Sequence, residues 1–200
     1  MHNLKELLQR ILYKFRVYTN FIYLRIHPKE KESIISRFHN LYYDSNIMGG
    51  TWRNTSFLGV PAQKCPLDLF VYQEIIYETR PDIIIEAGTA SVGGAYFLAT
   101  ICELMGKGEV VTIDITNTSE SPEHKRLTFL HGSSTSREIE QKVAEKIKGK
   151  ENVMVILDSD HSKKHVLKEL EIYSKFVTKG NYLIVEDTNV NGHPVNPEHG

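Results

Sequence analysis

Four acidic residues stand where two neighbouring strands are expected to end, and their oxygen atoms could hold a metal ion. Asp158 and Asp160 follow one apolar run, and Glu186 and Asp187 follow the next. In a doubly wound parallel sheet, the carboxyl ends of the strands share one rim. Two like charges about 5 Å apart repel by roughly 3 kcal/mol at an effective dielectric near 20, so such a cluster needs a compensating cation. Oxygen ligands on a flexible rim favour Mg²⁺.

Two of these acidic residues also have a structural alternative. Asp160 could cap the helix expected over residues 162–176, and Asp187 could shape the turn before Asn189. His161 is a candidate proton acceptor for catalysis, together with Asp160, or else a surface residue in the first turn of that helix. The spacing of His161 and His165 permits Zn²⁺ binding, but nothing else in the sequence indicates a zinc site.

A glycine-rich turn follows the apolar strand that contains Ile83, Ile84 and Ile85. Glycines here allow a sharp turn and the close approach of a ligand, and the helix that follows presents free N–H groups. The sequence EAGTASVGG lacks the G-x-G-x-x-G pattern of dinucleotide-binding proteins. Its pattern E-x-G-x-x-x-x-G-G resembles that of class I S-adenosylmethionine-dependent methyltransferases, in which the acidic residue, here Glu86, holds the amino-acid end of the cofactor.

Asp114 ends the next expected strand, 28 residues after Glu86. An acidic residue at this place commonly accepts hydrogen bonds from ribose hydroxyls, although it could instead cap a turn. A third strand is expected at residues 127–130, followed by HGSSTS. Ser133 and Ser134 could line an adenine site, or this segment could cap the helix that starts near Arg137.

Several segments together resemble the cephalosporin hydroxylase family, which includes rhamnosyl O-methyltransferases. The resemblance spans residues 51–200 and is most specific at DSDHS and EDT. It implies a methyltransferase that binds S-adenosylmethionine and Mg²⁺, with metal ligands among Asp160, Glu186 and Asp187, and with Asp158 as a competing ligand. The expected cofactor contacts are Glu86, Gly88, Thr89, Gly93, Gly94, Asp114, Ser133, Ser134 and Asp158.

The elements that must position these residues predict an α/β fold: a Rossmann-like class I methyltransferase three-layer sandwich with a mostly parallel sheet. Five strands can be placed where a full sheet of this class has seven, so the last strands are expected to be missing and the domain to be C-terminally incomplete. We expect a helical N-terminal extension over residues 1–45 and the methyltransferase-like domain over residues 46–200, in which NGHPVNPEHG begins a substrate-side loop.

Residues 42–66 are rich in Gly, Asn, Thr, Ser and Pro and predict a loop or lid that brings Trp52 and Lys64 towards the pocket mouth. Trp52 is interpreted first as a packing anchor and second as a platform for the substrate. An amphipathic helix then leads into the first strand, with Asp68 in its first turn.

Composition narrows the classes of partner. The chain has 200 residues and a net charge of −1, so no overall positive field attracts nucleic acid. Cys65 and Cys102 are interpreted as free structural thiols in a reducing cytoplasm.

The N-terminal segment differs from the rest of the chain. Its apolar residues recur at helical spacing and its charges are mostly basic, so packing on its own domain or on another subunit is expected, with peripheral membrane binding as the alternative. Charges interrupt every apolar run long enough to span a bilayer. The recurring apolar residues are Leu4, Leu7, Leu8, Ile11, Leu12, Phe15, Tyr18, Phe21 and Ile22.

We therefore predict a cytoplasmic, Mg²⁺-assisted O-methyltransferase that uses S-adenosylmethionine and acts on a hydroxyl of a small molecule, sugar or glycolipid. Transfer from sulfonium to oxygen is an in-line displacement, which requires alignment and a more nucleophilic hydroxyl. The alternatives are a non-catalytic cofactor-binding or interaction module and, less favoured, a hydroxylase. A non-haem iron oxygenase needs two histidines and a carboxylate, and no convincing pair of histidines accompanies the strand-end acids.

Overall fold

Short apolar runs form the central strands of a parallel sheet whose two faces are both covered. The computed structural model describes residues 2–44, 51–116 and 122–195, and the sheet order is β5-β4-β3-β6-β7, all parallel. These strands are β3 (Ile83–Ala87), β4 (Glu109–Asp114), β5 (Leu127–His131), β6 (Val153–Leu157) and β7 (Leu183–Val185). All five strands expected from the sequence are present, and the predicted α/β sandwich is confirmed.

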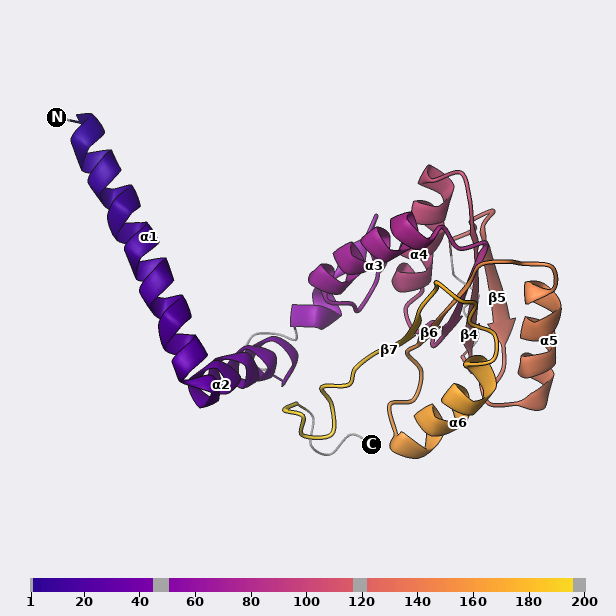
Figure 1. Ribbon diagram of the computed structural model, residues 1–200. Helices are drawn as coiled ribbons and strands as arrows, with labels where there is room; N and C mark the ends of the chain where they lie inside the picture. Colours follow the sequence, from indigo (N-terminus) through magenta and orange to yellow (C-terminus); the bar gives the residue numbers. More distant parts are fainter. Residues whose placement is uncertain (1, 45–50, 117–121, 196–200) are drawn as a thin grey trace.

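Helices cover both faces of the sheet (Figure 1). Alternate residues of β3 point to opposite sides: Ile83 and Ile85 pack with α5 and α6, whereas Ile84 packs with α3 and α4. Every residue of β3 and β6 is buried, as expected for central strands of a parallel sheet. The helices are α3 (Pro66–Thr79), α4 (Gly93–Leu104), α5 (Arg137–Ile147) and α6 (Lys163–Tyr173).

The ends of these helices follow local chemistry. Pro66 is the first residue of α3, where its missing N–H costs nothing, and Asp68 lies in the first turn as predicted. The Ser136 side chain caps α5 by accepting a hydrogen bond from the N–H of Ile139, so the predicted capping role of the HGSSTS segment is confirmed. The N-cap of α6 is Ser162, so the alternative of Asp160 as N-cap is wrong.

Strand register brings the candidate site residues together. Ala87 pairs with Leu157, and Leu157 pairs with Val185, so the residues that follow these three strands leave the sheet side by side. Asp114 pairs with His131 on the other side of β3. The predicted convergence of strand-end residues on one rim therefore follows from in-register parallel pairing.

The segment before α3 is more ordered than the loop predicted from its composition. It contains a 3₁₀ turn (Thr51–Asn54) and a hairpin of β1 (Ser56–Phe57) and β2 (Val60–Pro61); residues 45–50 of the predicted loop lie outside the described residues. Trp52 is half-buried and donates a hydrogen bond from Nε1 to the carbonyl of Tyr43, which agrees with a packing role. The predicted substrate-side loop is described as far as Val195.

The N-terminal arm consists of α1 (His2–Ile26), α2 (Pro28–His39) and a π-helical turn (Asn40–Asp44). In Figure 1, α1 extends away from the sheet and meets the rest of the chain through α2. From Leu4 to Ile26 every residue is exposed except Leu24, which is half-buried. The expectation that this helix packs on its own domain is therefore wrong. The division at residue 45 between extension and domain stays a prediction.

Candidate active site

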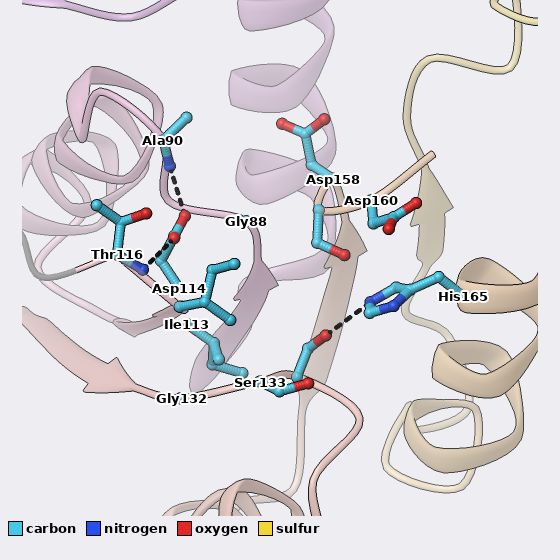
Figure 2. A pocket seen from close by; sticks show the side chains of 13 residues that line it. Gly88, Ala90, Ile113, Asp114, Thr116, Gly132, Ser133, Asp158, Asp160 and His165 are labelled. Atoms are coloured by element: carbon cyan, nitrogen blue, oxygen red, sulfur yellow. Dashed lines mark hydrogen bonds between the residues drawn. The ribbon is translucent and has the colours of Figure 1, made fainter. Parts of the chain in front are cut away.

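A cavity of about 460 Å³ opens at the carboxyl ends of β3, β4, β5 and β6. Ligands of doubly wound sheets bind at this edge of the sheet. Figure 2 shows Asp114 on one side of the cavity, and Asp158, Asp160 and His165 on the other. The lining residues are Gly88, Ala90, Ile113, Asp114, Ile115, Thr116, Gly132, Ser133, Ser134, Asp158, Ser159, Asp160 and His165.

Gly88 is the glycine that the cavity requires. Its φ of +100° is rarely adopted by other residues, and a Cβ atom there would lie 1.9 Å from the carbonyl oxygen of Asp158. Backbone hydrogen bonds join the neighbouring strand ends here. Asp158 N–H donates to the carbonyl of Ala87 at 2.7 Å, and Gly88 N–H donates to the carbonyl of Ile113 at 2.8 Å. Gly88 therefore permits β3 and β6 to meet at the cavity wall.

Gly93 and Gly94 do not line the cavity, although the sequence predicts them as cofactor contacts. A Cβ atom on Gly93 would lie 2.3 Å from the carbonyl oxygen of Pro61, and one on Gly94 would lie 3.4 Å from the Lys64 side chain. The missing side chain of Gly93 lets the hairpin approach the start of α4. Gly93 is therefore required for packing between backbone segments, whereas Gly94 faces the side chains of Lys64 and Glu86.

Asp114 accepts hydrogen bonds from the glycine-rich turn that follows β3. Its Oδ2 accepts hydrogen bonds from the N–H groups of Thr89 and Ala90, both at 3.0 Å, and its Oδ1 accepts one from Thr116 N–H at 2.7 Å. Partial burial acts to raise the pKa of Asp114, but the three donors outweigh it and hold the pKa below its usual range. Asp114 thus lines the cavity as a carboxylate.

Glu86 is buried beneath the turn and is absent from the cavity lining. It is 2% exposed, and its Oε2 accepts a hydrogen bond from Thr112 Oγ1 at 2.6 Å. Thr112 is in turn 2.7 Å from the hydroxyl of Thr89, another predicted cofactor contact outside the lining. Burial raises the pKa of Glu86 to about 7, despite the nearby Lys64 charge.

Lys64 forms ion pairs with two of the strand-end acids, Asp158 and Glu186. Its ammonium pairs with Asp158, and its Nζ lies 3.0 Å from Glu186 Oε1, which also accepts a hydrogen bond from Tyr72. Burial acts to lower the pKa of Lys64, but the carboxylates of Asp158 and Glu186 raise it above its usual range. Burial raises the pKa of Asp158 to about 6 although Lys64 opposes this shift.

A possible metal cluster lies beside these ion pairs. Ligand atoms of Asp158, His161 and Asp187 all lie within 4.8 Å of one another, and His161 Nε2 is 3.2 Å from Asp187 Oδ2. Two carboxylates and an imidazole are donors that fit a divalent cation. Three buried or half-buried carboxylates, those of Glu86, Asp158 and Glu186, already share the single charge of Lys64, so a further cation is electrostatically favourable here.

Asp160 and Glu186, which the sequence predicts as metal ligands, have other partners. Asp160 lines the cavity and accepts a hydrogen bond from Ser162 N–H at 2.8 Å, which holds its pKa below the usual range. Glu186 is bound to Lys64 and Tyr72. The structure therefore brings Asp187 together with Asp158, the competing candidate, and with His161.

Comparison with known proteins gives the family. The model of the family described as rhamnosyl O-methyltransferase/CmcI matches residues 49–200. The chain belongs to this family. A rhamnosyl O-methyltransferase of Mycobacterium leprae is 33% identical over 96% of this chain and 82% of its own length, and one of Mycobacterium bovis is 34% identical over 86% and 71%.

The solved structure of CmcI without ligand has a TM-score of 0.56 at 20% identity, over 73% of this chain and 62% of its own. A caffeoyl-CoA O-methyltransferase structure from Staphylococcus aureus, itself described as putative in function, has a TM-score of 0.53 at 20% identity, over 66% and 62%. These structures confirm the predicted class I methyltransferase fold. Membership of the rhamnosyl O-methyltransferase/CmcI family confirms the predicted class of enzyme, an O-methyltransferase.

Glu169 contacts residues that line the cavity, and no sequence motif pointed to it. Glu169 is fully buried, accepts a hydrogen bond from Ser159 Oγ at 2.6 Å and lies 3.3 Å from His165 Nε2. His165 Nε2 is also 3.1 Å from Ser134 Oγ. The dashed line that ends at His165 in Figure 2 marks this hydrogen bond. A signal existed, because Glu169 shares its helix face with the buried Ile172 and Tyr173.

Proposed function

We propose that this chain transfers a methyl group from S-adenosylmethionine to a hydroxyl of a sugar, with a divalent cation bound beside the acceptor. The observation that carries the proposal is the position of Asp158. It lines the cavity that begins at Gly88 and Asp114, and it also belongs to the cluster with His161 and Asp187. A methyl donor in the cavity and a methyl acceptor at the cluster would therefore both lie beside Asp158, in the proximity that an in-line displacement requires.

The relatives support both ligands. The mycobacterial relatives are named rhamnosyl O-methyltransferases, which favours a sugar as the acceptor. One solved structure of CmcI contains Mg and S-adenosylmethionine, and another contains S-adenosylhomocysteine. We infer Mg²⁺ or a similar hard divalent cation for this chain.

The cavity residues can hold the nucleoside part of the donor. A carboxylate offers about four acceptor sites, and Asp114 uses three of them for backbone N–H groups, so one remains for a ribose hydroxyl. Ser133 and Ser134 supply hydroxyl groups on the wall formed after β5. The residues that line the cavity do not include the predicted contacts Glu86, Thr89, Gly93 and Gly94.

The acceptor side supplies the chemistry. We assign the cation to the carboxylates of Asp158 and Asp187, where a bound divalent cation would lower the pKa of an acceptor hydroxyl. His161 is assigned as the proton acceptor, and Asp187 Oδ2, 3.2 Å from its Nε2, would stabilise the imidazolium. As the oxygen–carbon bond forms, the carbon–sulfur bond breaks, the sulfur keeps the electron pair and the hydroxyl proton passes to His161.

The test separates donor binding from methyl transfer. Calorimetry should show that S-adenosylhomocysteine binds the parent, and Asp114→Ala should weaken binding about tenfold to a hundredfold because a charge-assisted hydrogen bond is lost. Methyl transfer to a rhamnoside should require added Mg²⁺, and His161→Ala should lower kcat while leaving the affinity for S-adenosylhomocysteine unchanged. Absence of S-adenosylhomocysteine binding would refute the proposal, and equal rates in chelator would refute the role of the cation.

A further inference from the structure

The helix α1 has an apolar face that nothing in the described part of the chain covers. Along this face the side chains recur every three or four residues and are 51–70% exposed. Leu7 and Leu12 flank the row at 54% and 63% exposure, so the apolar face is broader than the narrow a/d seam of a two-stranded coiled coil. The row, called the apolar stripe below, comprises Leu4, Leu8, Ile11, Phe15, Tyr18, Ile22 and Ile26.

The charge of α1 is opposite to that of the remaining chain. Five basic residues lie in this helix against one acidic residue, Glu6, whereas the whole chain carries a net charge of −1. The positive charge is therefore concentrated on the arm. A helix that combines a broad apolar stripe with basic flanks complements a surface that is apolar inside and negatively charged outside, which is the surface of an anionic lipid bilayer. The basic residues are Lys5, Arg10, Lys14, Arg16 and Arg25.

A second copy of α1 is a poorer partner than a bilayer. Helices that pair through apolar seams usually place opposite charges along the flanks of the seam. Here each copy would bring five basic residues and a single acidic one, so most charge contacts between copies would be repulsive. Phosphate groups of lipids, in contrast, match every basic residue at once.

The helix would lie along the bilayer surface rather than cross it. None of the described helices is both long and apolar enough to span a membrane. Phe15, Tyr18, Phe21 and Tyr23 are aromatic residues of the kind that favours the interface between lipid and water. Figure 1 shows α1 extending away from the sheet, so the catalytic domain would not obstruct contact along the helix.

We propose that α1 is a membrane-surface anchor, with the apolar stripe inserted among acyl chains and the basic side chains at anionic lipid headgroups. The inference does not rest on the methyltransferase activity. It assigns to the arm a lipid partner that holds the catalytic domain close to the membrane.

Flotation of the full chain with lipid vesicles tests the anchor. The parent should float with vesicles of phosphatidylcholine mixed with phosphatidylglycerol, should bind vesicles of phosphatidylcholine alone more weakly, and should dissociate as salt is added. Replacing Lys14 with Gln should weaken binding to the mixed vesicles about fivefold, because each basic residue near the surface contributes a similar share. No flotation of the parent at low salt would overturn the proposal.

A matched pair of variants separates insertion from charge alone. Leu8→Asp/Phe15→Asp adds two negative charges to the apolar stripe, and Gln9→Asp/Asn20→Asp adds the same charge to the opposite face. The stripe variant should bind about a hundredfold or more weakly than the control variant, because two large apolar side chains no longer leave water. Equal weakening in the two variants would overturn insertion of the stripe.

Two further measurements keep the outcomes distinct. Thermal melting of the catalytic domain should be the same in all variants, since α1 does not pack on the sheet, which shows that lost flotation is not lost folding. The mass of the parent in solution, measured by light scattering, should not change in the stripe variant. A fall from dimer to monomer together with no flotation of the parent would assign the stripe to a second copy and overturn the membrane anchor.

Discussion

Asp114 and Asp158 end parallel strands on the same rim and line the same cavity, yet their surroundings differ in kind. Asp114 accepts three hydrogen bonds from backbone N–H groups, and its pKa is held below the usual range. Asp158 is more deeply buried and pairs with the Lys64 ammonium, and burial raises its pKa to about 6. Figure 2 shows the two on opposite sides of the cavity.

The difference shows that two carboxylates at strand ends on one rim can have opposite electrostatic surroundings. The β4 side is built from backbone dipoles and hydroxyl groups, which suit the neutral hydroxyl groups of a ribose. The β6–β7 side is built from carboxylates that share one ammonium group, which suits an additional cation. Each of the following experiments perturbs one side, or the junction between them.

The largest effect is expected at Gly88, where the two sides meet. Gly88→Ala should lower the free energy of unfolding by about 4 kcal/mol, since the new Cβ overlaps the Asp158 backbone and φ is positive. Gly106→Ala is the matched control: φ is +69° and no atom lies within 4 Å of its Cβ, so a loss of about 1 kcal/mol is expected. Urea denaturation measures both, and equal losses would show that the close approach to Asp158 is unimportant.

The next effect concerns the charge on the β6–β7 side. Lys64→Met should destabilise the fold by about 3 kcal/mol near neutral pH, because the half-buried carboxylates of Asp158 and Glu186 would lose their cation. In the control Lys107→Met, the loss should stay below about 1 kcal/mol, since the Lys107 side chain is 40% exposed and its ammonium pairs with Asp82 at the surface. Denaturation curves for the two variants should differ clearly. Similar curves would show that the ion pairs of Lys64 do not stabilise the fold.

The pH dependence of stability should have opposite signs for the two aspartates. The pKa of Asp158 is raised in the folded state, so its contribution is present below about pH 4 and is lost as the pH rises through about 6. Relative to Asp158→Asn, the parent should therefore lose about 2 to 3 kcal/mol between about pH 4 and 7 in chelator.

Asp114 supplies the reverse case. Because its folded-state pKa is lowered, its contribution is present above the unfolded-state pKa and is lost as the pH falls through the folded-state pKa. Relative to Asp114→Asn, the parent should lose stability in acid and not near neutral pH. Melting curves across the pH range measure both differences, and the same sign for both would contradict the comparison.

The smallest effect is the response to metal on the β6–β7 side. At ten times the Kd, Mg²⁺ should stabilise the parent by about 1.4 kcal/mol, and Asp187→Asn should lose most of this rise in melting temperature. Asp160→Asn should keep it, because Asp160 accepts from Ser162 N–H and lies outside the cluster with His161. The reverse pattern would restore Asp160 as the ligand in place of Asp158.

Local sequence was sufficient for the strands and for the rim. Ile83, Ile84 and Ile85 are buried on both faces of the central strand, and such continuous apolar runs have few other stable arrangements in a soluble domain. The place of Asp114 at the end of β4 was predictable for the same reason, because a charged residue ends an apolar run at the edge of the sheet. The glycine turn followed from residues within one short segment.

Partners far apart in the chain were decided by the tertiary structure. Lys64 reaches Asp158 across 94 residues and Glu186 across 122, because the hairpin packs on Gly93 and brings the following segment over the strand ends. No local pattern shows which of several strand-end acids this ammonium will meet. The sequence could therefore predict that acids gather at the rim, but not which of them Lys64 would bind.

The direction of each acidic side chain was also decided beyond the sequence pattern. Asp187 has a φ of +51°, which turns it towards His161, while Glu186 beside it turns to Lys64 and Tyr72. Local apolar content, which the sequence contains in full, decides which segments become buried strands. Side-chain direction after a strand depends on loop dihedral angles and distant charges, and these are fixed when the whole chain packs.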